Sequence, residues 1–156
     1  MHLTSRHELP ADPDTAFAML TDPAFLERAA RSSGATGIRA DASATRTAVQ
    51  ASVEAPAPLQ AFLGAQLSFT QVVVWGERDP DGGRLGRVSI DVARTPASVA
   101  GTVTLVPTAS GSALSWDGEL TVSVPLLGAT IERQAAPVIQ ETLDGIGREA
   151  RAWLDR

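Results

Sequence analysis

The chain has 156 residues, of which 44% are hydrophobic and 20% are charged, and its formal net charge is -5. This composition is typical of one soluble domain and excludes a disordered or collagen-like chain, so we expect a single domain over residues 1–156. Acidic residues outnumber basic ones, and the charged residues are distributed along the chain without blocks of one sign. This distribution argues against nucleic acid as a partner. Cysteine is absent, so disulfides and thiolate chemistry are excluded.

Lysine and tyrosine are also absent, and every basic residue except histidine is arginine. Schiff bases, lysine bases and tyrosine acids are therefore excluded, and only Asp, Glu, His, Arg, Ser and Thr remain for catalysis. No apolar run approaches the ~18 residues of a membrane span. The first ten residues resemble neither a signal peptide nor a transit segment, so we expect a cytoplasmic protein without membrane insertion.

The N-terminal part of the chain predicts one strand followed by two short helices. His2–Leu9 alternates apolar and polar residues with a period of two, which indicates a strand with one drier face. The Asp-Pro pairs at 12–13 and 22–23 are each typical of a helix start, and the second helix is expected to end at Gly34.

The middle of the chain predicts six antiparallel strands joined by turns. The turn signals are the glycine-containing segments Asp79–Gly83 and Thr108–Ser112. Glu54–Gly64 interrupts the strand pattern with two prolines and an apolar LQAFL run, which predicts a loop with one or two helical turns over an opening. The expected strands are Thr36–Ala42, Thr45–Val53, Gln66–Arg78, Arg84–Ala93, Ser98–Pro107 and Ser112–Val124.

After Pro125 the apolar residues recur at spacings of three and four, which predicts one long helix to the end of the chain. Pro137 predicts a kink near Arg133, and Gly145 and Gly147 either weaken the helix or let a sheet approach closely. We expect the apolar stripe to face inward and the charged residues outward. The inward set is Ile131, Ala135, Val138, Ile139 and Ile146, and the outward set is Glu132, Arg133, Glu141 and Arg148.

Two stretches carry a resemblance to a known superfamily. LPADPDTAFAMLTDPAFLERA at 9–29 resembles the turn and paired helices after the first strand of START-like, or Bet v 1-like (SRPBCC), proteins, and GELTVSVPLLGATIE at 118–132 resembles their last strand and the start of their C-terminal helix. The chain is most similar to an uncharacterised bacterial subgroup. The resemblance implies an α+β helix-grip fold, in which a curved antiparallel sheet of about seven strands surrounds a long C-terminal helix and often encloses a ligand cavity. Periodicity alone predicts only an α+β sandwich.

Strand and helix parity then select the candidate cavity residues. One face of the longest strand carries apolar and aromatic side chains interrupted by the amide of Gln71, which must satisfy its own hydrogen bonds or offer them to a ligand. The alternative is that these residues form an ordinary filled core. The candidates from the strands and the helix are Phe69, Gln71, Val73, Trp75, Trp116, Leu120, Ile131, Gln134, Val138 and Thr142, and Phe62 is placed at the mouth.

His7 shares the face of Leu3 and Leu9 and is the one near-neutral base that could reach a cavity, although it could equally be bonded to backbone or water. A metal site with His2 and Glu8 is not expected, because His2 and His7 fall on opposite faces of a strand. We predict no metal, no cofactor and no catalytic residue. The carboxylates of Asp12 and Asp14 are explained by helix capping and by the helix dipole. The alternation of residues along the strands predicts that four further charged residues face solvent, namely Arg87, Asp91, Asp117 and Glu119.

These features favour the binding of a small hydrophobic ligand, such as a lipid, polyketide or isoprenoid-like molecule, by a monomer or weak homodimer. One alternative is a cyclase- or dehydratase-type enzyme in which His7, Gln71 and Thr142 steer a reactive substrate. Another is a protein-interaction module of the same fold. A cavity below ~300 Å³ favours interaction, and a larger dry cavity favours binding.

Overall fold

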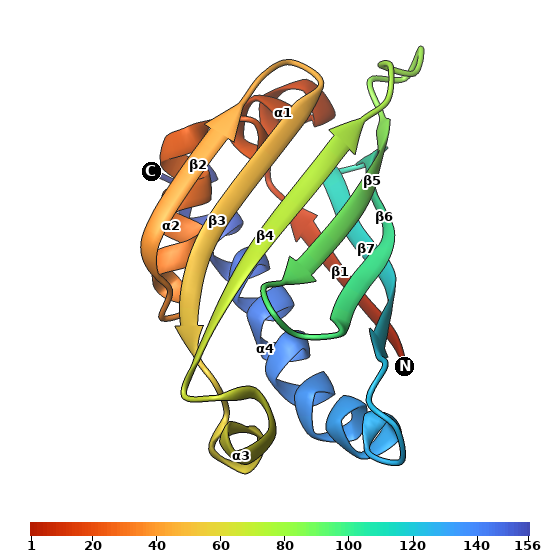
Figure 1. Ribbon diagram of the computed structural model, residues 1–156. Helices are drawn as coiled ribbons and strands as arrows, with labels where there is room; N and C mark the ends of the chain where they lie inside the picture. The colour runs from red at the N-terminus through yellow and green to blue at the C-terminus, as the bar shows by residue number, and fades with distance from the viewer.

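The computed structural model describes all 156 residues as a seven-stranded antiparallel sheet that curves around one long helix (Figure 1). The α+β fold, the strand number and the two short helices after the first strand are as predicted. The strands are β1 His2–Leu9, β2 Thr36–Ala42, β3 Arg46–Glu54, β4 Gln66–Trp75, β5 Arg84–Val92, β6 Ala97–Thr108 and β7 Gly111–Val122. The helices are α1 Pro13–Leu20, α2 Pro23–Ser32, a 3-10 turn η1 Ala57–Leu59, α3 Gln60–Leu63 and α4 Gly128–Leu154.

The strand order is β1-β7-β6-β5-β4-β3-β2, so successive strands from β2 to β7 are neighbours. The pairing of β1 with β7, in which Ser5 lies opposite Trp116, is the one strand contact between segments far apart in the sequence. This pairing brings the start of the chain beside the strand that leads into α4. The edges of the sheet are therefore β1 and β2.

The start of each short helix follows the chemistry of its Asp-Pro pair. Asp12 caps α1 by accepting a hydrogen bond of 2.7 Å from the backbone N–H of Thr15. Asp22 caps α2 through the N–H of Ala24 at 2.9 Å. In both helices proline occupies the first turn, where its missing N–H is not needed. The segment Glu54–Gly64 contains η1 and α3, which are the helical turns expected there.

Two apolar clusters hold the sheet and the helices together. The larger cluster joins α1, α2 and the C-terminal end of α4 to the sheet, and its most buried members include Leu105 and Leu114. The smaller cluster joins η1 and the start of α4 to the other end of the sheet, through Leu59, Leu120 and Ile131. The principal contacts of α4 are with β1, β7, α2 and η1, so α4 lies on one side of the concave face and not directly over β3–β5.

The long helix presents its faces largely as expected and runs uninterrupted through Pro137. Ile131 is fully buried, whereas Arg133, Glu141 and Arg148 are exposed. The placement of Glu132 outward was wrong: its carboxylate is half-buried and accepts a hydrogen bond from the backbone N–H of Val122 at 3.0 Å. The contact gives the backbone N–H at the end of β7 a hydrogen-bond acceptor. The periodicity of the helix does not indicate such a contact with a strand.

Leu105 provides a test of the larger cluster, because its side chain is completely buried. Leu105→Ala is expected to lower the free energy of unfolding by about 2–5 kcal/mol, through lost burial and a residual cavity. Leu85→Ala, at a site 52% exposed on β5, is the control and is expected to change it by less than about 0.5 kcal/mol. Equal effects in urea denaturation would contradict the assigned core.

Candidate functional site

A cavity of about 310 Å³ lies between the concave face of the sheet and the helices α2 and α4. Of the 33 residues that line it, 25 are hydrophobic. The walls come from α2, β3 to β7, the η1–α3 segment and α4, so nearly every element contributes. The volume is at the lower end of the range for small-molecule sites, about 300–1,000 Å³. The fold thus leaves a mostly apolar, partly open space between the sheet and the helices.

Nine of the twelve residues predicted from the sequence line this cavity. The parity of β4 places four of them, and the other five come from β7 and α4. They are Phe69, Gln71, Val73, Trp75, Trp116, Leu120, Ile131, Val138 and Thr142. Val138 is 45% exposed because it lies at the rim. The hydroxyl of Thr142 donates to the carbonyl of Val138 at 3.0 Å, so part of its hydrogen-bonding capacity is used within the helix.

The other three predicted residues lie outside the lining. His7 faces inward, but α4 covers it: position 147 is glycine, and a Cβ there would overlap the imidazole ring. Phe62 is 49% exposed and is not part of the lining, whereas its neighbour Leu63 lines the cavity. Gln134 is exposed, because it borders the apolar stripe of α4 on the solvent side. His7, Phe62 and Gln134 are therefore not part of the cavity lining, and their role in ligand binding stays a prediction.

Sequence reasoning missed the contributions of α2 and β3. Leu26 and Ala29 on α2, and Thr47 and Val49 on β3, line the cavity. The sequence did indicate the contribution of β5, because the alternation of its residues places Ile90 on the more apolar face of the strand, and Ile90 lines the cavity. The position of α2 over the sheet is a tertiary property, and no local pattern of α2 indicates it.

Two tryptophans stand in one cross-strand row at the inner end of the cavity. Trp75 pairs with Gly86, Gly86 with Val103, and Val103 with Trp116. Gly86 is required there, because a Cβ would come within 3.0 Å of the Trp75 ring and 2.9 Å of the Val103 side chain. Val103 is completely buried and Trp75 is 5% exposed. Trp75 belongs to the larger apolar cluster and also lines the cavity, so this tightly packed row is shared by the two.

The polar atoms of the lining are few and mostly neutral. The indole N–H groups of Trp75 and Trp116 are buried and have no hydrogen-bond acceptor within the protein. Glu54 is the one ionisable residue in the lining, and it is exposed. The indole N–H groups are packed within the protein, and the only ionisable side chain of the lining is the exposed Glu54.

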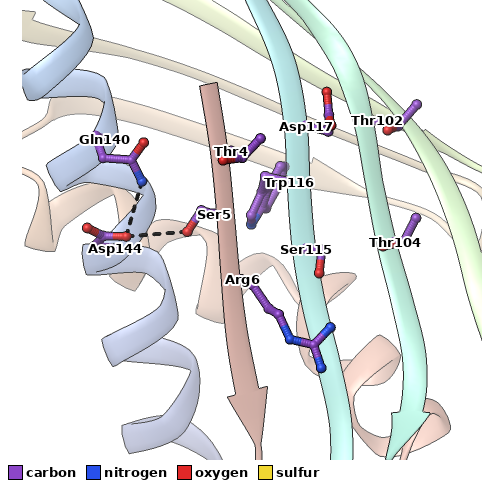
Figure 2. Close-up of a pocket in the computed structure, with 10 residues that line it drawn as sticks. All are labelled: Thr4, Ser5, Arg6, Thr102, Thr104, Ser115, Trp116, Asp117, Gln140 and Asp144. Carbon is purple, nitrogen blue, oxygen red and sulfur yellow. Dashed lines mark hydrogen bonds between the residues drawn. The ribbon is translucent and has the colours of Figure 1, made fainter. Parts of the chain in front are cut away.

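A separate polar cluster joins β1 to α4 (Figure 2). The hydroxyl of Ser5 lies 2.7 Å from Nε2 of His7 and 3.3 Å from a carboxylate oxygen of Asp144, which also accepts from the amide of Gln140 at 3.4 Å. Burial, and then the cation of Arg151, lower the pKa of His7 below its usual 6.5, although Asp144 opposes them. The neutral imidazole is thus favoured in the folded state.

The remaining residues in Figure 2 do not extend this cluster into a second site. Thr4 pairs with Asp117 and Arg6 with Ser115 on the outer face of the sheet, whereas Ser5 faces inward. Groups on opposite faces of a sheet do not converge on one ligand. No group of three or more His, Asp and Glu side chains is placed to hold a metal ion.

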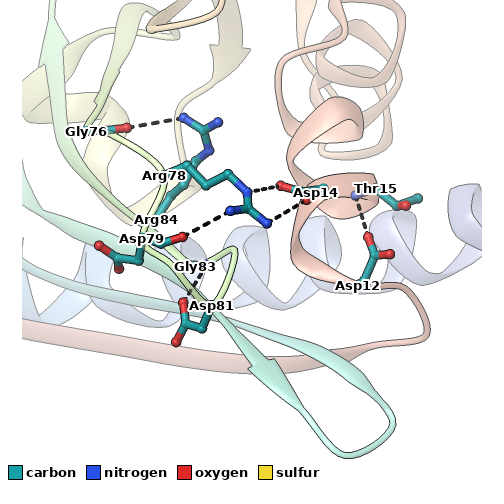
Figure 3. A network of polar contacts seen from close by, with 9 residues as sticks. All are labelled: Asp12, Asp14, Thr15, Gly76, Arg78, Asp79, Asp81, Gly83 and Arg84. Atoms are coloured by element: carbon teal, nitrogen blue, oxygen red, sulfur yellow. Dashed lines mark hydrogen bonds and ion pairs between the residues drawn. The ribbon is translucent and has the colours of Figure 1, made fainter.

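The aspartates near α1 belong to a structural network (Figure 3). Asp14 accepts two hydrogen bonds from Arg78, at 2.9 and 3.1 Å, which lower the pKa of Asp14. The bidentate pair connects α1 to the segment after β4. Arg87, Asp91, Asp117 and Glu119 are exposed, as parity predicted.

Comparison with solved structures identifies the class of this fold. A STAR-related lipid transfer protein from Xanthomonas axonopodis has 18% sequence identity and a TM-score of 0.71, over 99% of this chain and 86% of that one. The di-domain ARO/CYC StfQ from the steffimycin biosynthetic pathway has 15% identity and a TM-score of 0.68, over 99% of this chain and 50% of that one. Ara h 8.0201 has 9% identity and a TM-score of 0.61, over 99% and 97%.

The chain therefore has the START-like, or Bet v 1-like, helix-grip fold. It belongs to the DUF2505 family, described as a protein of unknown function, whose model matches residues 4–154. None of the curated proteins compared with the chain matches it. None of its helices combines the length and the apolar character needed to cross a membrane.

The lowered pKa of His7 predicts a pH dependence of stability. Between about pH 7 and pH 5 the unfolded chain binds a proton that the folded chain resists, so the free energy of unfolding is expected to fall as the pH decreases through this window. His7→Gln should flatten this slope, as measured by urea denaturation at several pH values. The quantity compared is the slope of the free energy of unfolding against pH. Its absolute value is not used, because His7→Gln also changes the packing against Gly147.

His2→Gln is the matched control. The hydrogen bond from His2 to Asp117, 2.8 Å long, raises the pKa of His2, so any contribution has the opposite sign and is lost as the pH rises. An unchanged slope in His7→Gln would contradict the assignment of the pH dependence to the cluster on α4.

Proposed function

We propose that this protein binds a small hydrophobic ligand, of lipid, polyketide or isoprenoid-like character, in the cavity between the sheet and α4. The observation that carries the proposal is the partly open cavity of about 310 Å³ with 25 hydrophobic residues among its 33 lining residues. Such a space recovers about 25 cal/mol for each Å² of apolar ligand surface removed from water. The fold neighbours that include a lipid transfer protein and an ARO/CYC protein support the same class of ligand.

The chemistry of the lining favours binding over catalysis. A cyclase- or dehydratase-type enzyme needs an acid or a base against the substrate. His7 and Asp144 lie behind Trp116 at the contact of β1 with α4, and only Glu54 at the rim is ionisable in the lining. The cavity volume lies just above the size that would favour a pure interaction module.

The surface charge supports a small molecule, rather than nucleic acid or a membrane-inserted state, as the partner. The net charge is -5, and the chain contains no lysine to form a dense basic patch. We propose a cytoplasmic protein that acts as a monomer or weak homodimer.

Blocking the cavity tests the proposal directly. Ala135 lines the cavity from α4, and Ala135→Phe is expected to fill part of it and to weaken binding of the neutral fluorophore N-phenylnaphthylamine about tenfold or more. Ala152→Phe is the control, because Ala152 is exposed on the same helix. Absence of fluorophore binding by the parent protein would contradict the proposal, as would equal binding by all three proteins.

The neighbouring residues of α3 give a second test, of the rim. Leu63 lines the cavity and Phe62 does not, although both lie in the same helical turn. Leu63→Ala is expected to weaken binding of the fluorophore about threefold or to speed its release, and Phe62→Ala should leave both unchanged. Stopped-flow fluorescence measures both. The opposite result would place the ligand on the outer side of α3.

A further inference from the structure

One neutral polar side chain interrupts the apolar wall that β4 gives to the cavity. Gln71 lies on the concave face of β4, and its four nearest neighbours on that face are apolar, namely Phe69, Val73, Val49 and Ile90. The amide of Gln71 makes no hydrogen bond within the protein. Unlike the indole nitrogens, its atoms keep accessible surface, since the side chain is only partly buried. The amide is therefore open to the cavity.

A second unbonded polar group lies close to Gln71 on the neighbouring strand. Thr47 of β3 pairs with Val73 of β4, so it is a diagonal cross-strand neighbour of Gln71 on the concave face. Such neighbours are about 7–8 Å apart, within reach of a long side chain. Thr47 is 3% exposed, and its hydroxyl makes no hydrogen bond but is not one of the fully enclosed polar atoms. The two groups do not bond each other, so a small polar group between them can bond both.

The other polar side chains of the lining are bonded to backbone, lie on the outer face of the sheet or are at the rim. Three hydroxyls donate to a carbonyl of their own segment, namely those of Ser33, Thr95 and Thr142. Ser98 lies in the cross-strand row of Thr70, on the face opposite to Gln71, and Glu54 is exposed at the rim. The hydroxyl and the amide of the Thr47–Gln71 pair are therefore the unbonded polar groups of the inner wall.

The lining offers no positive charge to an anionic ligand. None of the 13 arginines lines the cavity, and its one charged residue, Glu54, is negative. Burial of a carboxylate without a cation is far more costly than burial of a neutral hydroxyl that has hydrogen-bond partners. A ligand group that reaches the Thr47–Gln71 pair is therefore expected to be uncharged.

We propose that the cavity takes an uncharged hydrophobic ligand with a hydroxyl group, which donates a hydrogen bond to the amide oxygen of Gln71 and accepts one from the hydroxyl of Thr47. This inference rests on the proposed function. A hydroxyl group donates and accepts through one atom, so it satisfies both members of the pair. An ether oxygen only accepts and a hydrocarbon does neither, so each leaves the amide oxygen without a donor once water is displaced.

Three ligands of similar size test this selectivity by displacement of N-phenylnaphthylamine from the parent protein near neutral pH. The alcohol n-octanol carries the hydroxyl, methyl heptyl ether has the same atoms without an O–H group, and octanoate is an anion. We expect octanol to displace the fluorophore at a concentration about threefold or more below that of the ether and about tenfold or more below that of octanoate. Equal or tighter binding of the ether or of octanoate would overturn the inference and leave the proposed function standing.

Substitutions within the pair assign the selectivity to residues. Gln71→Met and Thr47→Val keep the approximate size of each side chain and remove its hydrogen-bonding group. Each is expected to reduce the preference for octanol over the ether to less than about twofold. Thr70→Val is the control, because Thr70 is adjacent to Gln71 on the opposite face of β4 and outside the lining. The quantity compared is the ratio of the two affinities in one variant, so a general change in cavity size largely cancels.

The outcomes separate the two proposals. A preference for octanol that persists in Gln71→Met or in Thr47→Val, or that disappears in Thr70→Val, would overturn the role of the pair. Failure of all three ligands and of the fluorophore to bind the parent protein would overturn the proposed function itself, and this inference with it. The comparison of the three ligands on the parent protein needs no variant, so it decides the inference even where a substitution prevents folding.

Discussion

The contact of α4 with the β1–β7 side of the sheet determines where the rest of the molecule lies. The contact is close because Gly147 has no side chain where the ring of His7 meets the helix. At the other end of the helix, Ile131 packs with Leu3 and Leu120. A helix held against one side of a curved sheet cannot also touch the middle of its concave face. The cavity is the space that this asymmetric contact leaves.

The sizes of the side chains then set the depth of that space. The ring of Trp75 and the side chain of Val103 pack closely over Gly86, where a Cβ would come within 3.0 Å of both. Towards the rim the lining includes small residues, such as Ala97 and Ala135. The apolar residues form two separate clusters instead of one continuous core, and both clusters contribute residues to the cavity lining.

The sequence patterns predicted the elements and most of the cavity wall for the same reason: both depend on local periodicity. The period of two in β4 places Phe69, Gln71 and Trp75 on the concave face, and the Asp-Pro pairs mark the starts of α1 and α2. Periodicity says which face a side chain occupies, but it does not say what covers that face. His7 was misplaced for this reason, since its face is correct and α4 covers it.

The prediction for Phe62 failed for a related reason. A single turn of helix is too short for hydrophobic periodicity to show which apolar residue faces inward. The sequence therefore allowed either Phe62 or Leu63 to line the cavity, and in the structure it is Leu63. The wall formed by α2 was also missed, because the packing of one helix over distant strands is set by the whole fold. The unpaired indole groups are likewise visible only in three dimensions, since their lack of acceptors depends on every neighbouring element.

The two sides of α4 separate charge from apolar surface. Towards β1 the helix presents Gln140 and Asp144 to Ser5 and His7, and towards the cavity it presents side chains such as Ile139. A change in the protonation of His7 therefore acts on how the helix is held, and it adds no charge to the lining of the cavity. The cavity side of the helix is apolar because the one ionisable residue of the lining, Glu54, comes from the end of β3 and not from α4.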